Sequence, residues 1–366
     1  MPVVEEQVVL STPKEFSEHL LTSTSYSCRT IADINRVRDQ LQKIHINGRT
    51  SICHFPIDGE LLQTTLNMLF IEEVDTIVYG FISIDKKPAS FWTDSNTAFK
   101  GVQYHANNGW TWQLPINKRI VIVLDLTSLL DVLEIKHVYL VYIHKMFEGM
   151  SSKVVALSLR TFHETCESMV RDKGFAAVGV TATAGSMGNI VRYKSTSTLP
   201  ISHATMVAEF VYGEFIRRCP LIKTLFEQQV AGLPDDLRMG GLPILSTFST
   251  KSLYIKAHLD KNDYGHCMIF FHREPDCQGG QFVLCEALIT LVASDSSALF
   301  LNSREVVHGT LPFSKGNQWG CAFVNRKSII TRCVNQIRDA DLPNPAEPSD
   351  IVMPSWGRKK LRVSGR

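Results

Sequence analysis

The chain has 366 residues, of which 44% are hydrophobic and 20% are charged, and its formal net charge is only +2. This composition is typical of a folded protein with a sizeable core, and it excludes a molecule that binds nucleic acid through its overall charge, so any basic surface must be local. No apolar run approaches the roughly 20 residues that span a bilayer, and the N-terminal segment lacks the basic and apolar regions of a secretory signal.

Residues 1–150 are predicted to form a mixed α/β region. Residues 31–44 place apolar side chains near helical spacing with charges between them, which predicts a helix. Runs rich in β-branched residues predict three strands, over residues 74–84, 119–126 and 138–143.

Residues 151–250 have a more helical pattern. Amphipathic spacing predicts three helices, over residues 161–173, 204–218 and 221–230. Gly174 follows the first of these helices and Pro220 follows the second, and both are typical of the position after a helix end.

Residues 253–334 have an almost wholly β pattern. Six strands are predicted, over residues 253–259, 267–272, 281–284, 287–292, 298–302 and 320–324, with turn residues between them. Several short strands at this spacing favour a sandwich or a jelly roll. We therefore expect an α+β protein with an N-terminal region (1–150), a jelly-roll core with flanking helices (151–340) and a Pro-rich, then basic, tail (341–366).

Nine cysteines are spread along the chain, and no two of them form a CxxC pair. The odd number and the scattered spacing argue against a disulfide framework and against a zinc knuckle. Most of these residues are expected to be small buried side chains in a reducing compartment, which is the nucleus or, alternatively, the cytoplasm.

The segment AHLDKNDYGHCMIFFH, residues 257–272, concentrates side chains of the kind that bind metals. Residues two apart in a strand point to the same side, so His258 and Asp260 project together. One imidazole and one carboxylate are two-thirds of the facial triad of non-haem Fe(II) oxygenases. His308, 50 residues after His258 and directly before a glycine, is the natural third ligand.

An HxD pair by itself is a weak signal, because short His/Asp pairs arise by chance, and the alternative for His258 is a surface histidine. His266 and His272 are competing ligands. His272 begins a segment typical of a turn, where a solvated histidine is expected, and His266 is at most a group that contacts a ligand.

The chain resembles the TET/JBP family of Fe(II)- and 2-oxoglutarate-dependent dioxygenases, most of all its compact fungal and algal group. The resemblance covers roughly residues 155–335, and the segments that carry it are AHLDKNDYGHCMIFF (257–271), GGQFVL (279–284) and ALFLNSREVVHG (298–309). It implies a double-stranded β-helix, or jelly-roll, oxygenase core in which His258, Asp260 and His308 bind Fe(II). It also implies oxidation of the methyl group of 5-methylcytosine in DNA.

The chain departs from the pattern of that family after His308. Members usually carry an arginine about ten residues later, which forms a bidentate ion pair with the far carboxylate of 2-oxoglutarate. Gln318 stands at that place here, and Lys315 or the more distant Arg326 would have to substitute. An algal branch of the family uses ascorbate (vitamin C) instead, and Asp263 and Gln318 are suited to hydrogen-bond its hydroxyls. The cosubstrate is therefore 2-oxoglutarate or, alternatively, ascorbate, with Asp263, Gln318 and Lys315 as candidate contacts; Asp263 is equally compatible with an ordinary turn residue.

The resemblance implies methylated DNA and O₂ as partners, with the target base extruded from the duplex. Stacking rings and phosphate contacts are expected from Trp110 and Trp112 and from the tail residues Arg358, Lys359 and Lys360. Buried core tryptophans and a solvated tail are the alternatives. We expect a monomer without membrane association. Competing hypotheses are a catalytically silent nucleic-acid-binding relative and an oxygenase that acts on RNA or on a protein side chain.

Overall fold

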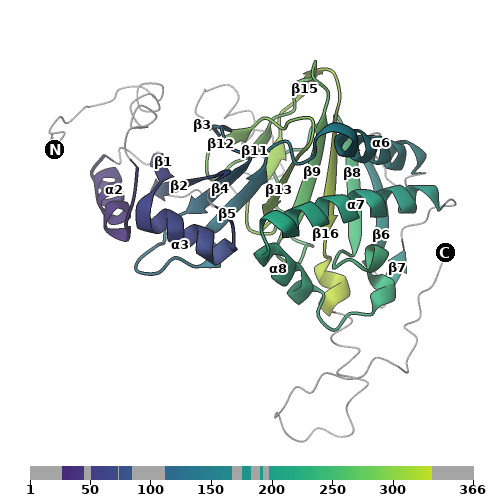
Figure 1. Ribbon diagram of the computed structural model, residues 1–366, viewed down its shortest axis with the longest axis horizontal. Coiled ribbons are helices and arrows are strands. Elements are labelled where there is room, and N and C mark those ends of the chain that lie inside the picture. Colours follow the sequence, from purple (N-terminus) through teal and green to yellow (C-terminus); the bar gives the residue numbers. More distant parts are fainter. Residues whose placement is uncertain are drawn as a thin grey trace, which may run out of the picture.

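A ten-stranded sheet is the largest element of the fold. The computed structural model describes residues 27–44, 51–72, 74–84, 112–166, 175–182, 190–192 and 198–331. In spatial order the strands of the main sheet are β1 (Ser51–Ile57), β2 (Thr76–Ile84), β4 (Ile120–Asp125), β5 (Val138–Ile143), β13 (Ser297–Leu301), β9 (Cys267–Arg273), β16 (Gln318–Val324), β8 (Ser246–Lys251), β6 (Phe175–Ala182) and β7 (Ile190–Arg192) (Figure 1). Only β2 and β4 run parallel, and every other pair of neighbours in this sheet is antiparallel.

A smaller second sheet packs against the main sheet. Its strands, in spatial order, are β14 (His308–Thr310), β11 (Phe282–Leu284), β12 (Ile289–Leu291) and β3 (Trp112–Gln113). His258 pairs with His308, which places the segment around His258 at the free side of β14. A separate hairpin joins β10 (Gln278–Gly279) to β15 (Phe313–Lys315).

The chain alternates between the two sheets in the manner of a jelly roll. It passes from β8 in the main sheet to the His258 segment in the second sheet, then to β9 and to β11. From β12 in the second sheet it returns to β13, crosses to β14 and ends in β16 of the main sheet. Four extended segments of the main sheet and four of the second sheet, connected in this way, form the double-stranded β-helix. The predicted α+β jelly-roll class is therefore confirmed.

The N-terminal strands continue the same main sheet. β5 pairs with β13 through Ala298 and Ile143, Leu299 and Tyr142, and Phe300 and Val141. β3 also joins the second sheet, parallel to β12. The hydrogen-bonded sheet thus crosses residue 150, where the sequence pattern placed a boundary, and elements on both sides of that residue share one core.

Helices cover one face of the main sheet, and the second sheet covers the other face (Figure 1). The α-helices are α2 (Ile31–Ile44), α3 (Gly59–Leu69), α6 (Gly149–Thr165), α7 (Leu199–Arg218) and α8 (Leu221–Gln229), and the short 3-10 turns are Ile135–His137, Asp235–Leu237 and Met239–Gly241. Because successive strand residues point to opposite faces, Phe270 on β9 packs with α7 and α8, whereas Phe271 packs toward Phe282 of the second sheet.

The predicted helices over 31–44, 204–218 and 221–230 correspond to α2, α7 and α8. The helix predicted over 161–173 begins too late, because the apolar stripe of α6 begins earlier, with Val155, Leu159 and Phe162; residues 167–173 lie outside the described residues. The strand predicted over 253–259 is reduced to a single bridge at His258, and β8 and β1 are strands that the pattern did not predict.

The eight cysteines in the described residues are free and buried, as expected. No helix in this part of the chain combines the length and apolar character that crossing a bilayer needs.

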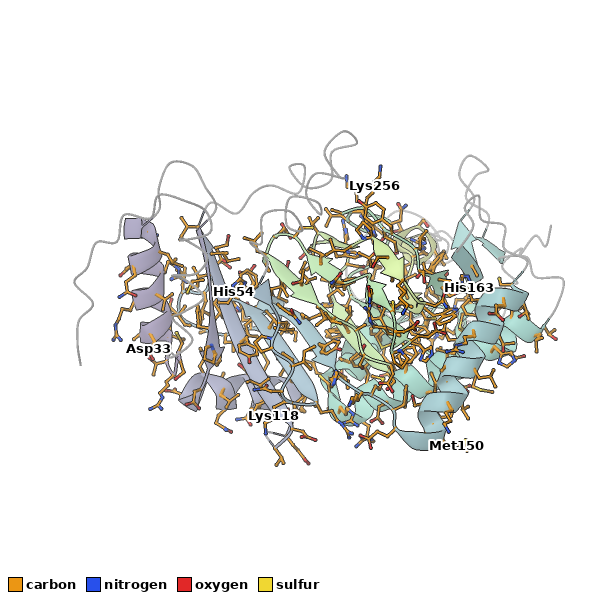
Figure 2. All side chains as sticks on the ribbon, turned by 90° about the horizontal axis from the view of Figure 1, so that it is seen from above. Asp33, His54, Lys118, Met150, His163 and Lys256 are labelled. Carbon is orange, nitrogen blue, oxygen red and sulfur yellow. The ribbon has the colours of Figure 1, made fainter. Side chains whose placement is uncertain are left out.

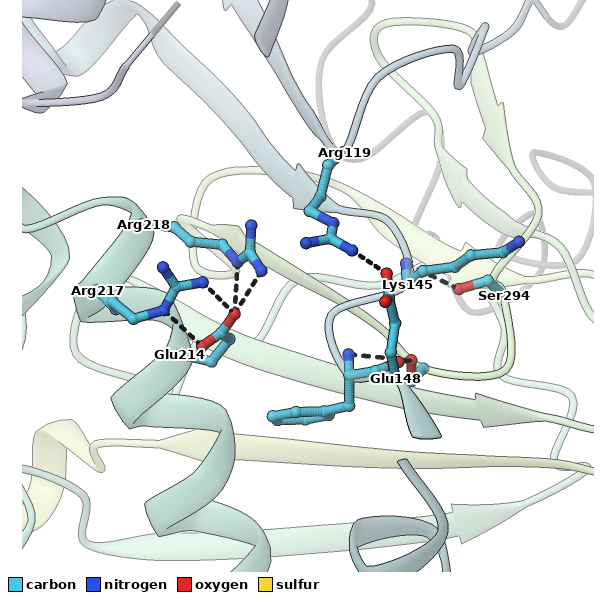
Figure 3. Close-up of polar contacts among 9 residues, drawn as sticks. Arg119, Lys145, Glu148, Glu214, Arg217, Arg218 and Ser294 are labelled. Atoms are coloured by element: carbon cyan, nitrogen blue, oxygen red, sulfur yellow. Dashed lines mark hydrogen bonds and ion pairs between the residues drawn. The ribbon is translucent and has the colours of Figure 1, made fainter. Parts of the chain in front are cut away.

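Two clusters of charge lie where α7 and α6 meet the main sheet (Figure 3). Glu214 on α7 accepts hydrogen bonds from Arg217 Nε at 2.9 Å and from Arg218 Nε at 2.7 Å. Nearby, Arg119 forms an ion pair with Glu148, the residue before α6. Burial alone would raise the pKa of Glu214, but the two guanidinium groups lower it below its ordinary value. The Arg218 side chain is only 10% exposed, so its charge depends on this partner.

We expect Glu214→Ala to lower the free energy of unfolding by about 2 kcal/mol, because Arg218 would stay largely buried without a counter-ion. Glu227→Ala on α8 is the matched control: it breaks an exposed pair with Lys223 and should change stability by at most about 0.5 kcal/mol. Urea denaturation of both variants checks the difference, and equal losses would contradict it.

Candidate metal centre

His258 and His308 lie directly opposite each other on two antiparallel segments. His258 N donates to His308 O at 2.9 Å, and His308 N donates to His258 O at 3.0 Å. Residues that exchange both hydrogen bonds present their side chains on the same side of the pair. The two imidazole centroids are accordingly 4.4 Å apart.

Asp260 completes the cluster from the turn that follows His258. Its backbone N donates to Ser303 O at 3.0 Å, which anchors this turn to the loop before β14. Its carboxylate oxygens lie 3.5 Å from His258 Nε2 and 3.4 Å from His308 Nε2. One ligand atom from each of the three residues lies within 4.8 Å of the others, and no other such group occurs among the described residues.

Backbone carbonyls orient both imidazoles. His258 Nδ1 is 2.8 Å from Lys256 O, and His308 Nδ1 is 2.8 Å from Val306 O. A carbonyl oxygen only accepts, so each Nδ1 carries the hydrogen and each neutral ring offers the lone pair of Nε2. His308 is 3% exposed, and its ring stacks on Phe282 with centroids 5.6 Å apart.

The electrostatics of the cluster favour an ionised carboxylate. Burial alone would raise the pKa of Asp260, but its contacts with the imidazoles of His258 and His308 lower it strongly. Burial alone would lower the pKa of His258, but Asp260 raises it overall. The site therefore concentrates negative charge between two imidazoles, and two nitrogen donors with one carboxylate oxygen are the facial donor set that Fe(II) takes in oxygenases. The residues fit that metal.

A glycine permits the close approach of the two strands at this point. A Cβ on Gly309 would lie 2.8 Å from Ile255 O and 3.1 Å from Ala257 N. Any larger residue would push β14 away from the segment that carries His258. The glycine after His308 thus belongs to the geometry of the site.

Asp263 is a buried carboxylate beside the cluster, which its place in a turn did not predict. It is 2% exposed, and it accepts a hydrogen bond from Arg326 Nη1 at 2.8 Å and one from Ser303 Oγ at 3.4 Å. Burial and the nearby charge of Asp260 raise its pKa to about 7, against the opposing effect of Arg326. Arg326 itself stacks over the Phe248 ring, with Cζ 4.5 Å from the centroid.

Gln318 is buried and paired with an arginine that the sequence analysis did not single out. Its Oε1 accepts from Arg273 Nη1 at 2.7 Å, and its Nε2 donates to Gly280 O at 3.2 Å. Arg273 stands opposite Gln318 in the pairing of β9 with β16, and it shares the inner face of β9 with Phe271. Only this cross-strand register brings the two together, because 45 residues separate them in the sequence.

The remaining candidates lie apart from the cluster. The Lys315 side chain is 61% exposed and pairs with Asp276 at 3.8 Å between Nζ and Oδ2. The His272 ring nitrogens lie 2.7 Å from Arg160 Nη2 on α6 and 2.7 Å from Asp295 O in the turn before β13, so its ring is held elsewhere. The His266 ring stacks on Phe300, on the face that the helices cover.

Four of the residues proposed to contact nucleic acid lie outside the described residues: Trp110, Arg358, Lys359 and Lys360. The backbone of Trp112 belongs to β3, and its side chain also lies outside the described set. Their roles stay predictions.

Residues 124–340 match the sequence family of the CMD1/TET dioxygenase C-terminal domain, which is more than half of the chain. The chain belongs to the CMD1/TET dioxygenase family. The matched region begins within β4 and includes every residue of the metal cluster. The metal donor set described above is therefore found in a chain whose family is one of dioxygenases.

Comparisons with other proteins add little to this assignment. No curated protein matches the sequence. Among solved structures, NgTET1 in complex with 5mC DNA is similar at 12% identity and a TM-score of 0.46, covering 70% of this chain and 100% of that one. An oxidoreductase of the 2OG-Fe(II) oxygenase family from Burkholderia pseudomallei has 11% identity and a TM-score of 0.34, covering 50% of this chain and 82% of that one. A prolyl hydroxylase from Trichoplax adhaerens, in complex with a hypoxia inducible factor peptide, has 9% sequence identity and a TM-score of 0.32. That match covers 53% of this chain and 86% of the hydroxylase chain. The family assignment rests on the sequence match.

We expect the intact chain to bind one Fe(II) ion. His258→Ala and His308→Ala should each weaken that binding by at least about 100-fold, because each removes a metal ligand. The loss of a hydrogen bond to a ligand would weaken it less. Anaerobic calorimetric titration with Fe(II) measures the affinity and the stoichiometry. His272→Ala is the matched control, since its ring is held elsewhere, and it should bind iron as the intact chain does. Equal affinity in all four proteins would contradict the assignment.

Proposed function

We propose that this protein is a non-haem Fe(II) dioxygenase that oxidises the methyl group of 5-methylcytosine in DNA, with 2-oxoglutarate as its cosubstrate. The observation that carries the proposal is the convergence of His258, Asp260 and His308 on a jelly roll whose sequence belongs to the CMD1/TET family. The substrate is inferred from what the family resemblance implies. A nuclear location follows from that substrate and is part of the proposal.

The three residues would hold the iron, and bound iron supplies the activation of O₂ that oxidation of a methyl C–H bond requires. The chain itself keeps the ligands in place. The carbonyls of Lys256 and Val306 hold both Nε2 atoms toward Asp260, and the backbone bond from Asp260 to Ser303 holds the carboxylate between them. Such outer contacts set the orientation of metal ligands and raise the basicity of the imidazoles.

The cluster is open to solvent on one side. The side chains of His258 and Asp260 are 34% and 32% exposed, whereas the His308 side chain is 4% exposed and packed on Phe282. A substrate base therefore reaches the metal from the side of His258 and Asp260. A base inside a duplex cannot reach it, so the reaction requires extrusion of the methylated nucleotide.

We expect the intact protein with Fe(II) to convert 5-methylcytosine in duplex DNA to 5-hydroxymethylcytosine, and Asp260→Ala to abolish turnover because the metal loses its carboxylate. Mass spectrometry of nucleosides after digestion of the DNA measures the product. Thermal denaturation of both proteins without metal shows that the variant keeps the fold. Methylated RNA and methylated peptides serve as parallel substrates. Reaction of a peptide alone would overturn the DNA proposal, and iron binding without turnover of any substrate would favour the catalytically silent alternative.

The position of Arg273 supports 2-oxoglutarate as the cosubstrate. Gln318 occupies the place where family members usually carry an arginine, and the guanidinium of Arg273 lies next to it from the neighbouring strand. The positive charge that a dicarboxylate requires is thus present on the inner face of the barrel, although it comes from β9 instead of β16. Lys315 is a weaker candidate for this contact because its side chain extends into solvent.

The surroundings of Asp263 favour ascorbate as a second candidate. A buried carboxylate near Asp260 repels a dicarboxylate but accepts hydrogen bonds from the hydroxyls of ascorbate. Arg326 is already engaged by Asp263 and is therefore not free to pair with 2-oxoglutarate.

Assays with each cosubstrate alone separate the two candidates. With 2-oxoglutarate we expect full activity, and we expect Arg273→Gln to raise KM for 2-oxoglutarate by at least about 10-fold, since a charge-assisted contact is lost. Lys315→Ala is the control and should leave this KM unchanged. Activity with ascorbate alone, lost in the isosteric variant Asp263→Asn, would establish the second candidate in place of the first.

A further inference from the structure

Four exposed cations, which we call the rim, lie on segments that adjoin the turn of Asp260 or are hydrogen-bonded to it: Lys256, Lys261, Arg304 and Lys327. They come from three separate parts of the sequence, and the fold gathers them around one site. No sequence pattern groups all four, because the three segments that carry them lie far apart in the sequence.

Two rim residues flank the HxD pair in the chain. Lys256 precedes His258 by two residues, and its carbonyl accepts the hydrogen bond of His258 Nδ1. Lys261 directly follows Asp260, and its backbone N donates to Leu259 O at 2.9 Å. Both side chains therefore start from the backbone that positions the ligands.

The other two rim residues reach the same turn from later segments. Arg304 follows Ser303, whose carbonyl accepts from Asp260 N at 3.0 Å. Lys327 N donates to Asn262 O at 2.9 Å, which places Lys327 beside the turn between Asp260 and Asp263. The backbones of all four residues thus adjoin the segment from Lys256 to Asp263 that carries His258 and Asp260, and all four side chains are exposed.

Three of the rim residues, Lys261, Arg304 and Lys327, carry charge that is unpaired within the described residues. Elsewhere many basic side chains pair with carboxylates: Arg29 with Asp58, Arg36 with Asp33, Arg119 with Glu148, Lys136 with Glu134, Lys223 with Glu227 and Lys315 with Asp276. Within the described ranges, no ion pair or hydrogen bond engages the side chains of Lys261, Arg304 or Lys327. Exposed Glu305 is the carboxylate next to Arg304 in sequence, while Asp260 faces the imidazoles and Asp263 faces Arg326.

We infer that the rim is the surface on which the phosphate backbone of DNA docks, on either side of the extruded base. The inference rests on the proposed function for the substrate, and it names the residues that hold that substrate. Unpaired lysine and arginine side chains bind phosphates by releasing condensed counterions, without regard to base sequence. A net charge of only +2 makes such a local surface necessary, because the molecule as a whole attracts DNA weakly.

The test compares a rim variant with a variant of equal charge. The rim variant carries Lys261→Ala, Arg304→Ala and Lys327→Ala. The control carries Lys118→Ala, Lys145→Ala and Lys153→Ala, three exposed lysines away from the site. In Figure 2, Lys118 and Met150, which lies in the first turn of the helix that carries Lys153, lie across the molecule from Lys256. Thermal denaturation confirms that both variants are folded.

Binding of a duplex with one 5-methylcytosine is measured by fluorescence anisotropy over a range of salt concentrations, in the absence of cosubstrate. For the rim variant we expect the slope of log K against log salt to become shallower by about 0.9 per lost contact, about three in total, with no change for the control. In turnover assays KM for DNA should rise while kcat stays the same, since phosphate contacts bind the substrate and the transition state equally.

Equal salt slopes for the rim variant and the control would overturn the inference. If the intact protein oxidises methylated DNA and the rim variant binds DNA as the intact protein does, the inference fails and the proposed function stands. If the rim variant loses affinity for DNA but the intact protein oxidises no DNA, the rim stands and the proposed function fails. Loss of affinity for RNA alone, with no binding of DNA, would also overturn the inference.

Discussion

The reciprocal backbone hydrogen bonds between His258 and His308 are the constraint on which the metal cluster depends. They fix two residues 50 positions apart in the chain as direct neighbours with both rings on one side. The pairing is possible because Gly309 has no Cβ to meet the facing backbone. Once the rings are adjacent, a carboxylate two residues after His258 reaches both of them, and the jelly roll thereby turns a short motif into a three-ligand site.

Charge is distributed differently inside and outside this site. Inside, each negative group has a partner: Asp260 lies between two imidazoles, and Asp263 is held by Arg326 and Ser303. Outside, the rim residues Lys261, Arg304 and Lys327 present exposed cations that no ion pair or hydrogen bond engages within the described ranges. A metal dication between His258, Asp260 and His308 would increase the positive character of that side further. The arrangement suits a polyanion that delivers one neutral group to the metal.

The main sheet of the jelly roll also carries the N-terminal strands β1, β2, β4 and β5. β13 pairs with β9 on one side and with β5 on the other, so the barrel is continued by β5, β4, β2 and β1. Helices α6, α7 and α8 cover the opposite face of this sheet from the second sheet. The N-terminal region therefore contributes to the stability of the core strands, and its loss would expose the edge and the buried faces of β13.

Local patterns in the sequence were sufficient to predict several helices and the side on which the first two metal ligands lie. Apolar spacing predicted α2, α7 and α8, turn residues separated the short strands, and the two-residue period of a strand placed His258 and Asp260 on one side. His308 was identified as the natural third ligand from its place directly before a glycine, and the resemblance implied the same role. Only the tertiary structure decided the rest: the pairing of β5 with β13, the burial of Asp263 against Arg326, and the position of Arg273 opposite Gln318. Each of these depends on the register between strands that lie far apart in the chain. Register is set by the packing of whole sheets, so it cannot be predicted from a single segment.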